Sequence, residues 1–405
     1  MTGPHRVVIT GAGAFTALGA GAGRLWQATR DGESGVHHID FERVPDQHVM
    51  HAAGISDELL KAHVVHERPR MQDRVTKFAL IAAEEAVQQS GFGEGDFDER
   101  FGVIVGSGFG GADALDRNYW IFSRQEGERM DPLCIPKIMT NAAASWVSMT
   151  YGARGPVYCN STACSSASQS IGMAYQMVKA GIMDRCITGG SEACVVPGVF
   201  RAWELLRVLS PTGCAPFSAN RNGMVLGEGA GILVIETLES AEKRGAEVLA
   251  EIVGYGTSSD AGDLLRPDPD GAARAMQSAL DDAGLAPGDV GYVNAHGTAT
   301  VANDISETAA MREVFGEAFD DLAVSSTKPV HGHALGAAGA LESVVTLEAL
   351  RAQLAPPSLN FEEVDPKIGF TPVTGAARAL DTRYCATNSF AFGGINASLI
   401  LGQFD

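Results

Sequence analysis

The sequence predicts an α/β protein built from two similar halves, each a mixed sheet covered by helices. Segments with helical apolar spacing alternate with short apolar strands along the chain, which is typical of this class. The same helix–glycine–strand unit occurs once in each half. The 48 glycines fall mostly in short clusters beside apolar runs, as tight strand-to-helix turns require. We place the halves at residues 1–250 and 251–405.

The repeated unit is clearest where a helix ends at a glycine and a strand follows. In the first half the spacing predicts a helix over 78–90 and a strand over 101–106. In the second half it predicts a helix over 272–283 and a strand over 290–297. Further along, strands at 157–161 and 322–326 each run into a small-residue turn and a helix, at 165–179 and 340–351. Each half then closes on a strand pair, 185–188 with 231–235 and 384–387 with 397–401.

The composition of the chain excludes several classes of partner. The 405 residues carry a formal net charge of -19, which argues against nucleic acid because phosphate binding needs a clustered basic surface. The first residues show no secretory leader, and the apolar runs are too short for a membrane helix. The seven cysteines form no CxxC pair, so we expect neither disulfides nor a metal site. We therefore expect a cytoplasmic protein with reduced thiols.

Cys164 is the strongest candidate nucleophile. It lies in a run of small residues, Asn160-Ser-Thr-Ala-Cys-Ser-Ser-Ala167, between a strand and a helix. Free N–H groups at the amino terminus of a helix favour a thiolate, and small neighbours leave room for an acyl chain. The alternative is a buried structural cysteine, which is how we interpret most of the other six.

Two histidines occupy positions suited to acyl transfer. His296 ends an apolar strand and precedes a glycine, at the end of the strand where ligands collect in α/β sheets. His333 lies in a glycine-rich turn before a helix, five residues after Lys328. Imidazoles can polarise a carbonyl or move protons for an acyl group held by a thiolate. A core histidine bonded to backbone groups is the alternative for His296, and His331 is interpreted as an ordinary loop residue.

Two glycine-rich segments are candidates for ligand binding, and only one of them is kept. The paired glycines after Phe390 and Phe392 predict a tight loop whose backbone N–H faces a ligand, with a plain hairpin turn as the alternative. Residues 11–16 follow a strand and look like the opening of a dinucleotide fingerprint. Thr16 stands where the third glycine belongs, so we reject a nicotinamide site.

Four segments, taken in order, resemble the beta-ketoacyl-ACP synthases, in the elongating branch of the thiolase superfamily. They are the cysteine segment, the His-Gly-Thr segment at 296–298, the lysine and histidine segment at 328–339 and the Asn-Ser-Phe-Ala-Phe-Gly-Gly segment at 388–394. The resemblance covers nearly the whole chain. It implies a thiolase-like five-layered αβαβα fold from two duplicated halves, which agrees with the internal repeat. It also implies decarboxylative Claisen condensation in fatty acid or polyketide elongation, and the ketosynthase subunit of a type II polyketide synthase is one form the family takes.

The resemblance implies a role for each motif residue. Cys164 would hold the acyl group, while His296 and His333 would bind the malonyl thioester carbonyl and promote loss of carbon dioxide. The backbone amides of Cys164 and Phe392 would form the oxyanion hole, with Phe392 as the gate of the acyl pocket. Lys328 would support the histidines.

Three acidic residues complete that set as supporting residues. Glu342, fourteen residues after Lys328, matches its ion-pair partner. Asp304 and Glu307 match acidic positions after the His-Gly-Thr segment, and we expect them to be structural.

The resemblance also places residues around the acyl pocket, and some depart from the usual pattern. Phe109, Cys134 and Ile138 would line the pocket. Cys134 stands where some fatty acid enzymes have a bulky aromatic residue, so we expect a longer tunnel toward a dimer partner. Ala391 replaces the first glycine of the usual Gly-Phe-Gly-Gly and is expected to stiffen the gate.

Partners follow from the same family. We expect acyl carrier protein as the carrier of both substrates, no cofactor beyond the phosphopantetheine of that carrier, and a homodimer or a heterodimer with a chain-length factor. Carrier proteins are acidic, so we expect docking on a local basic patch. The candidate docking residues are Arg68, Arg70, Arg74, Lys77, Arg129 and Arg207.

Related branches fit the sequence less well. Degradative thiolases have a second catalytic cysteine near the carboxyl end, but the loop at 390–394 has none. Initiating synthases use Cys-His-Asn, whereas this sequence has histidine at both positions. Inactive chain-length factors lack the cysteine that is present here as Cys164. A ketosynthase active only with a chain-length factor and a non-catalytic, pocket-shaping subunit remain the alternatives.

Overall fold

The computed structural model describes residues 3–64, 68–124, 127 and 129–404, and its centre is a long mixed sheet. The strands run in the order β12-β11-β15-β16-β10-β1-β9-β7-β5-β6, with β2 paired to β1. Their bounds are β1 (Val7–Thr16), β2 (Gly19–Ala20), β5 (Phe101–Gly106), β6 (Val157–Tyr158), β7 (Arg185–Glu192), β9 (Gly229–Thr237), β10 (Ala250–Ser259), β11 (Val290–Asn294), β12 (Ala323–Ser325), β15 (Tyr384–Ala391) and β16 (Ile395–Gly402).

The strand order confirms the two duplicated halves. Outward from the centre, β1-β9-β7-β5-β6 and β10-β16-β15-β11-β12 show the same pairing: two antiparallel contacts and then two parallel ones. The halves meet where β1 and β10 pair antiparallel, with Val7 opposite Ile252. The repeat found in the sequence is therefore a repeat of topology.

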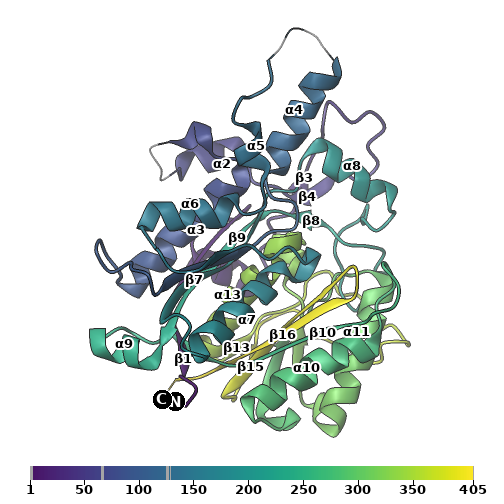
Figure 1. Cartoon of the computed structure of the whole chain (residues 1–405). Helices are drawn as coiled ribbons and strands as arrows, with labels where there is room; N and C mark the ends of the chain where they lie inside the picture. Colours follow the sequence, from purple (N-terminus) through teal and green to yellow (C-terminus); the bar gives the residue numbers. More distant parts are fainter. Residues whose placement is uncertain (1–2, 65–67, 125–126, 128, 405) are drawn as a thin grey trace.

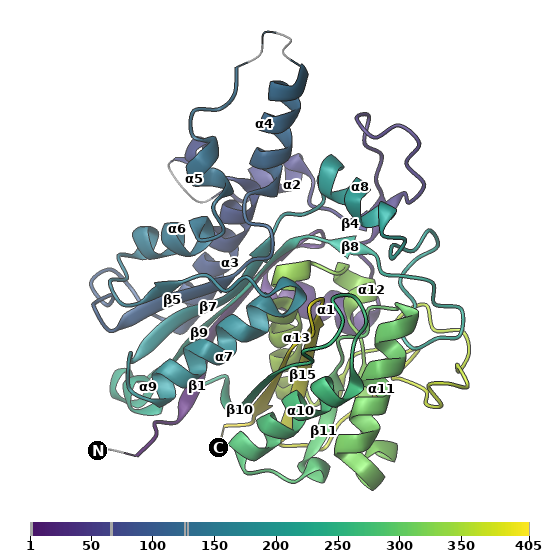
Figure 2. The same cartoon turned by 45° about the vertical axis from the view of Figure 1, so that its right-hand side comes forward.

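Helices divide the molecule into five layers (Figures 1 and 2). α3 and α6 cover the outer face of the first half, α7 and α13 lie between the halves, and α10 and α11 cover the outer face of the second half. The helices are α1 (Ala22–Asp31), α2 (Asp57–Ala62), α3 (Arg74–Ser90), α4 (Ala112–Arg124), α5 (Cys134–Ile138), α6 (Ala142–Tyr151), α7 (Ser166–Lys179), α8 (Pro197–Leu205), α9 (Leu238–Arg244), α10 (Pro269–Ala283), α11 (Val301–Phe315), α12 (Lys328–His331) and α13 (Ala338–Ala352).

Short elements complete the chain around these layers. The remaining strands are β3 (His37–His38), β4 (His51–Ala53), β8 (Leu226–Gly227), β13 (Leu354–Ala355) and β14 (Arg378–Ala379). Two short 3-10 turns, Ala163–Ser165 and Leu335–Ala337, lead directly into the inner helices α7 and α13. These two turns carry much of the site described below.

The glycine segment at 11–16 is strand, which explains why it resembles a dinucleotide fingerprint without being one. β1 continues without a turn to Thr16, and α3 packs directly on it. A Cβ at Gly11 would lie 2.0 Å from the carbonyl oxygen of Ala86, and one at Gly13 would lie 2.0 Å from that of Ala82. The glycines let a helix approach the sheet.

The predicted helices and strands are present with shifted ends. α3 begins at Arg74 because the side chain of Asp73 accepts a hydrogen bond from the Val75 N–H and caps the helix. The strand predicted over 157–161 is shorter, because β6 ends at Tyr158. Among the described residues, the helices include none long and apolar enough to cross a membrane.

Candidate active site

Cys164 lies in the 3-10 turn at the amino end of α7, between the two halves. The residue before it, Ala163, has a φ of 51°, a left-handed conformation that is rare for a residue with a side chain. The turn is held by the Ser166 hydroxyl, which donates to the Ala163 carbonyl at 2.6 Å and accepts from the Thr162 N–H at 2.9 Å. Small residues at 160–167 therefore allow a strained turn that directs the thiol into a cavity.

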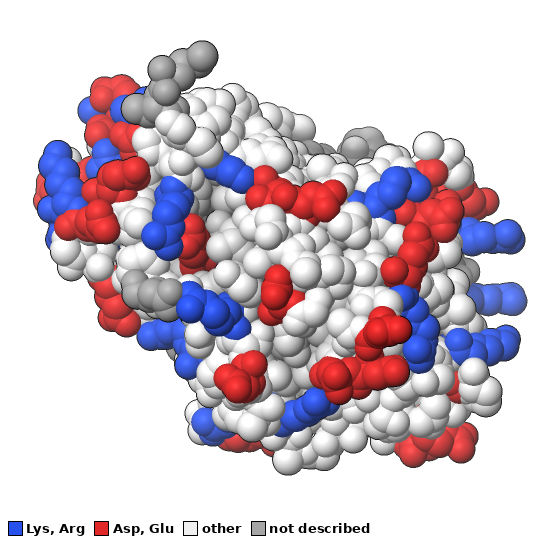
Figure 3. Space-filling model, turned by 90° about the horizontal axis from the view of Figure 1, so that it is seen from below, with Lys and Arg blue, Asp and Glu red and all other residues white. Residues whose placement is uncertain are grey.

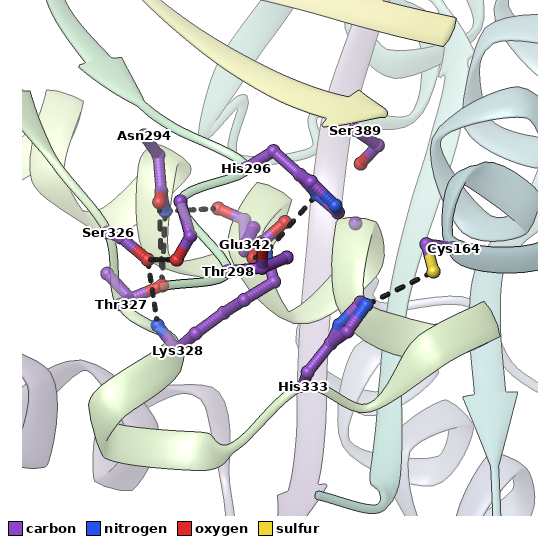
Figure 4. Close-up of polar contacts among 12 residues, drawn as sticks. Cys164, Asn294, His296, Thr298, Ser326, Thr327, Lys328, His333, Glu342 and Ser389 are labelled. Atoms are coloured by element: carbon purple, nitrogen blue, oxygen red, sulfur yellow. Dashed lines mark hydrogen bonds and ion pairs between the residues drawn. The ribbon is translucent and has the colours of Figure 1, made fainter. Parts of the chain in front are cut away.

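Two histidines from the second half face this thiol (Figure 4). His333 Nε2 lies 3.1 Å from Cys164 Sγ. The rings of His296 and His333 are perpendicular, with centroids 5.4 Å apart. The fold thus brings together residues that are far apart in the sequence.

Lys328 sits behind the histidines in a fully buried ion pair with Glu342. Its Nζ also lies 3.4 Å from His296 Nδ1. Burial, and then the nearby Lys328 charge, hold the pKa of both His296 and His333 well below its usual range. Both imidazoles are therefore neutral at physiological pH, and each can donate one hydrogen bond and accept another.

The thiol itself does not match the sequence argument for a thiolate. Burial raises the pKa of Cys164 to about 12, although the Lys328 charge and a hydrogen bond from the Phe392 backbone N–H oppose that rise. The free protein therefore holds a neutral thiol, because desolvation outweighs the helix terminus. Its proton can pass to the neighbouring imidazole of His333 when the sulfur attacks.

Glu307 and Asp304 hold the backbone around His296. The carboxylate of Glu307 accepts hydrogen bonds from the N–H groups of His296 and Gly297, each at 2.7 Å. Asp304 accepts from the N–H groups of Phe217 and Ala299, which both have positive φ angles, 65° and 63°. Both acids are fully buried, and burial raises the pKa of Glu307 to about 7 and of Asp304 to about 6.

Cys164 and both histidines line one cavity of about 150 Å³. Thr298 and Thr300 also line it, and their hydroxyls are 2.9 Å apart. Phe392 closes another side and stacks on Trp203 of α8, with ring centroids 5.7 Å apart. A thioester that entered here would meet a nucleophile, two imidazoles and the Phe392 N–H together.

The residues predicted to line the acyl pocket do not line this cavity. Phe109 is 43% exposed, and Ile138 lies at the end of α5. Cys134 is buried, with its sulfur 4.0 Å from the Ala114 carbonyl of α4. These three residues are therefore not among those that line the cavity at the thiol, and the pocket assignment stays a prediction.

The candidate docking cations lie in two places. Arg70, Arg74, Lys77 and Arg129 line a hollow of about 810 Å³ beside the start of α3, and Arg68 is exposed just ahead of it. Arg207 is exposed in the chain segment after α8, between Leu206 and Val208, which line the cavity at Cys164.

Arg74 differs from the other predicted docking residues in that hollow, because it is paired. Its guanidinium pairs with the buried Glu228 at 2.6 Å and with Asp57 at 2.7 Å, and its side chain is 12% exposed. Glu228 and Asp57 therefore offset its charge, which makes Arg74 the weakest of the docking candidates. The face in Figure 3 shows acidic and basic side chains interspersed.

Sequence reasoning missed Glu192, Thr298 and Thr300. The two threonines alternate directly after the His296-Gly pair, so their hydroxyls were a visible signal. Glu192 is a fully buried acid that ends β7 after a pair of glycines, and only the folded chain reveals what it binds. His331 is buried rather than a free loop residue, and its ring nitrogens bond Thr327 Oγ1 and the Gly332 carbonyl.

Comparison with known proteins agrees over the full length. The chain matches the models of the Beta-ketoacyl synthase, N-terminal domain, over residues 5–241 and of the C-terminal domain over 249–362. It is 40% identical to Nodulation protein E of Rhizobium sp. (strain N33), over 98% of this chain and 99% of that one. It is 39% identical to 3-oxoacyl-[acyl-carrier-protein] synthase 2 of Staphylococcus aureus (strain N315), over 100% of both.

Solved structures show the same fold. The ishigamide ketosynthase/chain length factor structure superposes with a TM-score of 0.94 at 32% identity, covering 99% of this chain and 100% of that one. The agreement therefore includes both halves and the turns that carry the cysteine and the histidines. This chain belongs to the beta-ketoacyl synthase family.

Proposed function

We propose that this protein is an acyltransferase, a beta-ketoacyl-[acyl-carrier-protein] synthase that elongates fatty acyl or polyketide chains. The observation that carries the proposal is the arrangement at Cys164: its sulfur lies 3.1 Å from His333 Nε2 and accepts from the Phe392 N–H, in a cavity that His296 also lines. A nucleophile, two neutral imidazoles and a backbone donor are what acyl transfer and decarboxylation need.

Acylation uses the thiol and the neighbouring histidine. Cys164 Sγ attacks the carbonyl carbon of the incoming thioester while its proton passes to His333 Nε2. The oxygen that becomes negative is stabilised by the N–H groups of Cys164 and Phe392. The carrier leaves as a thiol after it takes up the proton, and the acyl group stays on sulfur.

Condensation then uses both histidines. The malonyl thioester carbonyl lies against His296 and His333, which donate hydrogen bonds to the oxygen as the carboxylate leaves as carbon dioxide. The resulting enolate carbon attacks the acyl carbon on Cys164, and the carbon–sulfur bond breaks. Lys328 and Glu342 keep the histidines neutral and in place, as the buried ion pair and the 3.4 Å contact to His296 support.

The substrates would arrive on an acyl carrier protein, so the proposal needs no resident cofactor and suits a cytoplasmic enzyme. We place carrier docking at Arg68, Arg70, Lys77, Arg129 and Arg207, without Arg74. The hollow at Arg70 also contains Arg117 and Lys137, although three aspartates share it. Reversing Arg70 and Arg129 together should raise KM for the carrier substrate at low salt, while Arg154→Glu, an exposed control, should leave it unchanged.

The active unit we propose is a dimer. Large apolar side chains are exposed along α4 to β6, among them Tyr119 at 63%, Ile135 at 65% and Met149 at 62%. β6 is the edge strand of the sheet, and its Tyr158 is 46% exposed. Exposed apolar surface beside a free edge strand favours pairing with a second subunit. That subunit is either a second copy or a chain-length factor, and co-expression with sizing decides between them.

The test of the proposed activity uses the purified chain with acyl and malonyl carrier proteins. We expect mass spectrometry to find the acyl group on Cys164 and a 3-oxoacyl carrier as product. Cys164→Ala should form neither. If the chain is inactive alone and with every chain-length factor tested, yet folded, the alternative of a pocket-shaping subunit replaces this proposal.

A further inference from the structure

Glu192 is a fully buried acid at the end of β7 that the reaction above does not use. Its Oε1 accepts hydrogen bonds from the Ser107 hydroxyl at 3.2 Å and the Phe109 N–H at 3.1 Å. Its Oε2 accepts from the Gly108 N–H at 2.7 Å and the Gly336 N–H at 3.0 Å. One carboxylate therefore joins the end of β7, the loop after β5 and the turn after His333.

An ionised carboxylate satisfies this set of donors best. Each oxygen accepts two hydrogen bonds, and three of the four donors are backbone N–H groups, which cannot accept a hydrogen bond from a protonated acid or an amide. Burial raises the pKa of Glu192 to about 7, although these hydrogen bonds oppose the rise. The four donors stabilise the charged form against the effect of burial.

The two glycines in the set are needed for this close approach. A Cβ at Gly108 would lie 2.8 Å from Glu192 Oε2, and one at Gly336 would lie 2.5 Å from the same oxygen. Neither position has room for a side chain. The sequence thus leaves space for the carboxylate on both sides of the contact.

The turn that Glu192 holds is strained. Leu335, directly before Gly336, has a φ of 43°, and its side chain is buried in the cluster that includes Cys164. Such a conformation persists only where the surroundings determine it. On the near side, the His333 N–H donates to the Val225 carbonyl at 2.7 Å; on the far side, the Gly336 N–H donates to Glu192.

The charge of Glu192 also acts on the nucleophile. It is one of the groups that raise the pKa of the Cys164 thiol, after burial. The same carboxylate therefore has two separable effects, one through its hydrogen bonds and one through its charge.

We propose that Glu192 is a positioning residue: its ionised carboxylate ties the turn behind His333 to the loop after β5, and so holds His333 at bonding distance from Cys164. The proposal rests on the proposed function in one respect only, the condensation that Cys164 and His333 perform together. The tie itself is a property of the folded chain.

The experiment compares Glu192→Gln, which removes the charge, with Glu192→Asp, which keeps the charge but shortens the side chain. Both break the tie, so both should lower kcat of condensation by about 100-fold, as small misplacements of reacting groups do, with KM for the malonyl carrier unchanged. Alkylation of Cys164 by iodoacetamide at one pH should be several-fold faster in Glu192→Gln only, because only that change lowers the pKa of the thiol.

The matched control is Glu85→Gln, another carboxylate that binds backbone N–H groups, those of Ala14 and Ala22, away from Cys164. It should move neither readout, and denaturation curves should show all variants folded. Wild-type kcat in Glu192→Gln would overturn the proposal, as would equally fast alkylation in Glu192→Asp, which would indicate general loosening. A wild-type chain that does not condense would count against the proposed function alone, since alkylation still tests Glu192.

Discussion

The turns at 163–165 and 335–337 occupy equivalent places in the two halves but contain different residues. Each is a short 3-10 turn that opens an inner helix, and each contains a residue with a side chain at positive φ, Ala163 at 51° and Leu335 at 43°. The first turn presents Cys164. At the corresponding place the second turn has Gly336, whose N–H binds Glu192.

The difference shows how two halves with the same topology supply different residues to one active site. The first half supplies the nucleophile, while the second supplies both histidines and the buried lysine. The strained turn of the first half directs the Cys164 thiol into the cavity, and the strained turn of the second half helps to hold His333. The predictions below test this division.

Removing the lysine of the second half should have the largest effect. Lys328→Met leaves Glu342 buried without its partner, and breaking a buried pair in this way costs about 3–5 kcal/mol of unfolding free energy. The pKa of Glu342 is already raised to about 7, and losing Lys328 raises it further. Protonation relieves the buried charge, so the deficit should be larger at pH 8 than at pH 6, as measured by urea unfolding.

The partly exposed pair of Lys179 and Asp282 is the control for that change. Lys179→Met should cost at most about 1 kcal/mol, with little dependence on pH over the same range. Equal losses of unfolding free energy in the two variants would mean that burial adds nothing to the cost of breaking the pair of Lys328 and Glu342.

Removing His333 should separate the two halves of the chemistry. His333→Ala should lower malonyl decarboxylation by about 100- to 1,000-fold, because a donor to the developing charge is lost. Alkylation of Cys164 should slow as well, because the neutral thiol loses the imidazole that accepts its proton, but it should not stop, since the nucleophile itself is intact. An unchanged decarboxylation rate, followed as carbon dioxide release, would remove His333 from the mechanism.

Adding a methyl group at the second turn should destabilise the fold by about 1–3 kcal/mol, as overpacking does. At Gly336 the new Cβ would lie 2.3 Å from the Gly108 nitrogen as well as close to Glu192. Gly284→Ala is the control, because that glycine has positive φ but open space around it. Thermal unfolding should show a larger loss for Gly336→Ala than for the control.

Relaxing the first turn should have the smallest effect. Ala163→Gly places a glycine where φ is 51° and should change stability by at most about 1 kcal/mol, since relief of strain opposes the greater freedom of the unfolded chain. Condensation should fall modestly because the thiol is directed less firmly. A large loss of stability would show that the Ala163 methyl packs more than its geometry indicates.

The sequence was most informative where chemistry and periodicity coincide. Helical spacing that ends at glycines predicted α3 and α10. Cys164, His296 and His333 were predicted as site residues because they lie in turns beside strands or helices. The state of the thiol could not be read there, because its pKa depends on burial that many separate segments create. The ion pair of Arg74 could not be predicted for a similar reason: its partner Glu228 is distant in the sequence.

The place of β1 in the sheet has a consequence for how the chain folds. It precedes every other described strand in the chain, yet it pairs on one side with β9, Val7 opposite Thr237, and on the other with β10, Val7 opposite Ile252. Both neighbours therefore leave the ribosome long after β1, and until then most of β1 has no partner strand, since β2 pairs only with its last two residues. Closing such distant contacts slows folding and exposes apolar strand to aggregation. We expect refolding to be slow and synthesis to benefit from a chaperone that covers β1 until residue 252 has emerged.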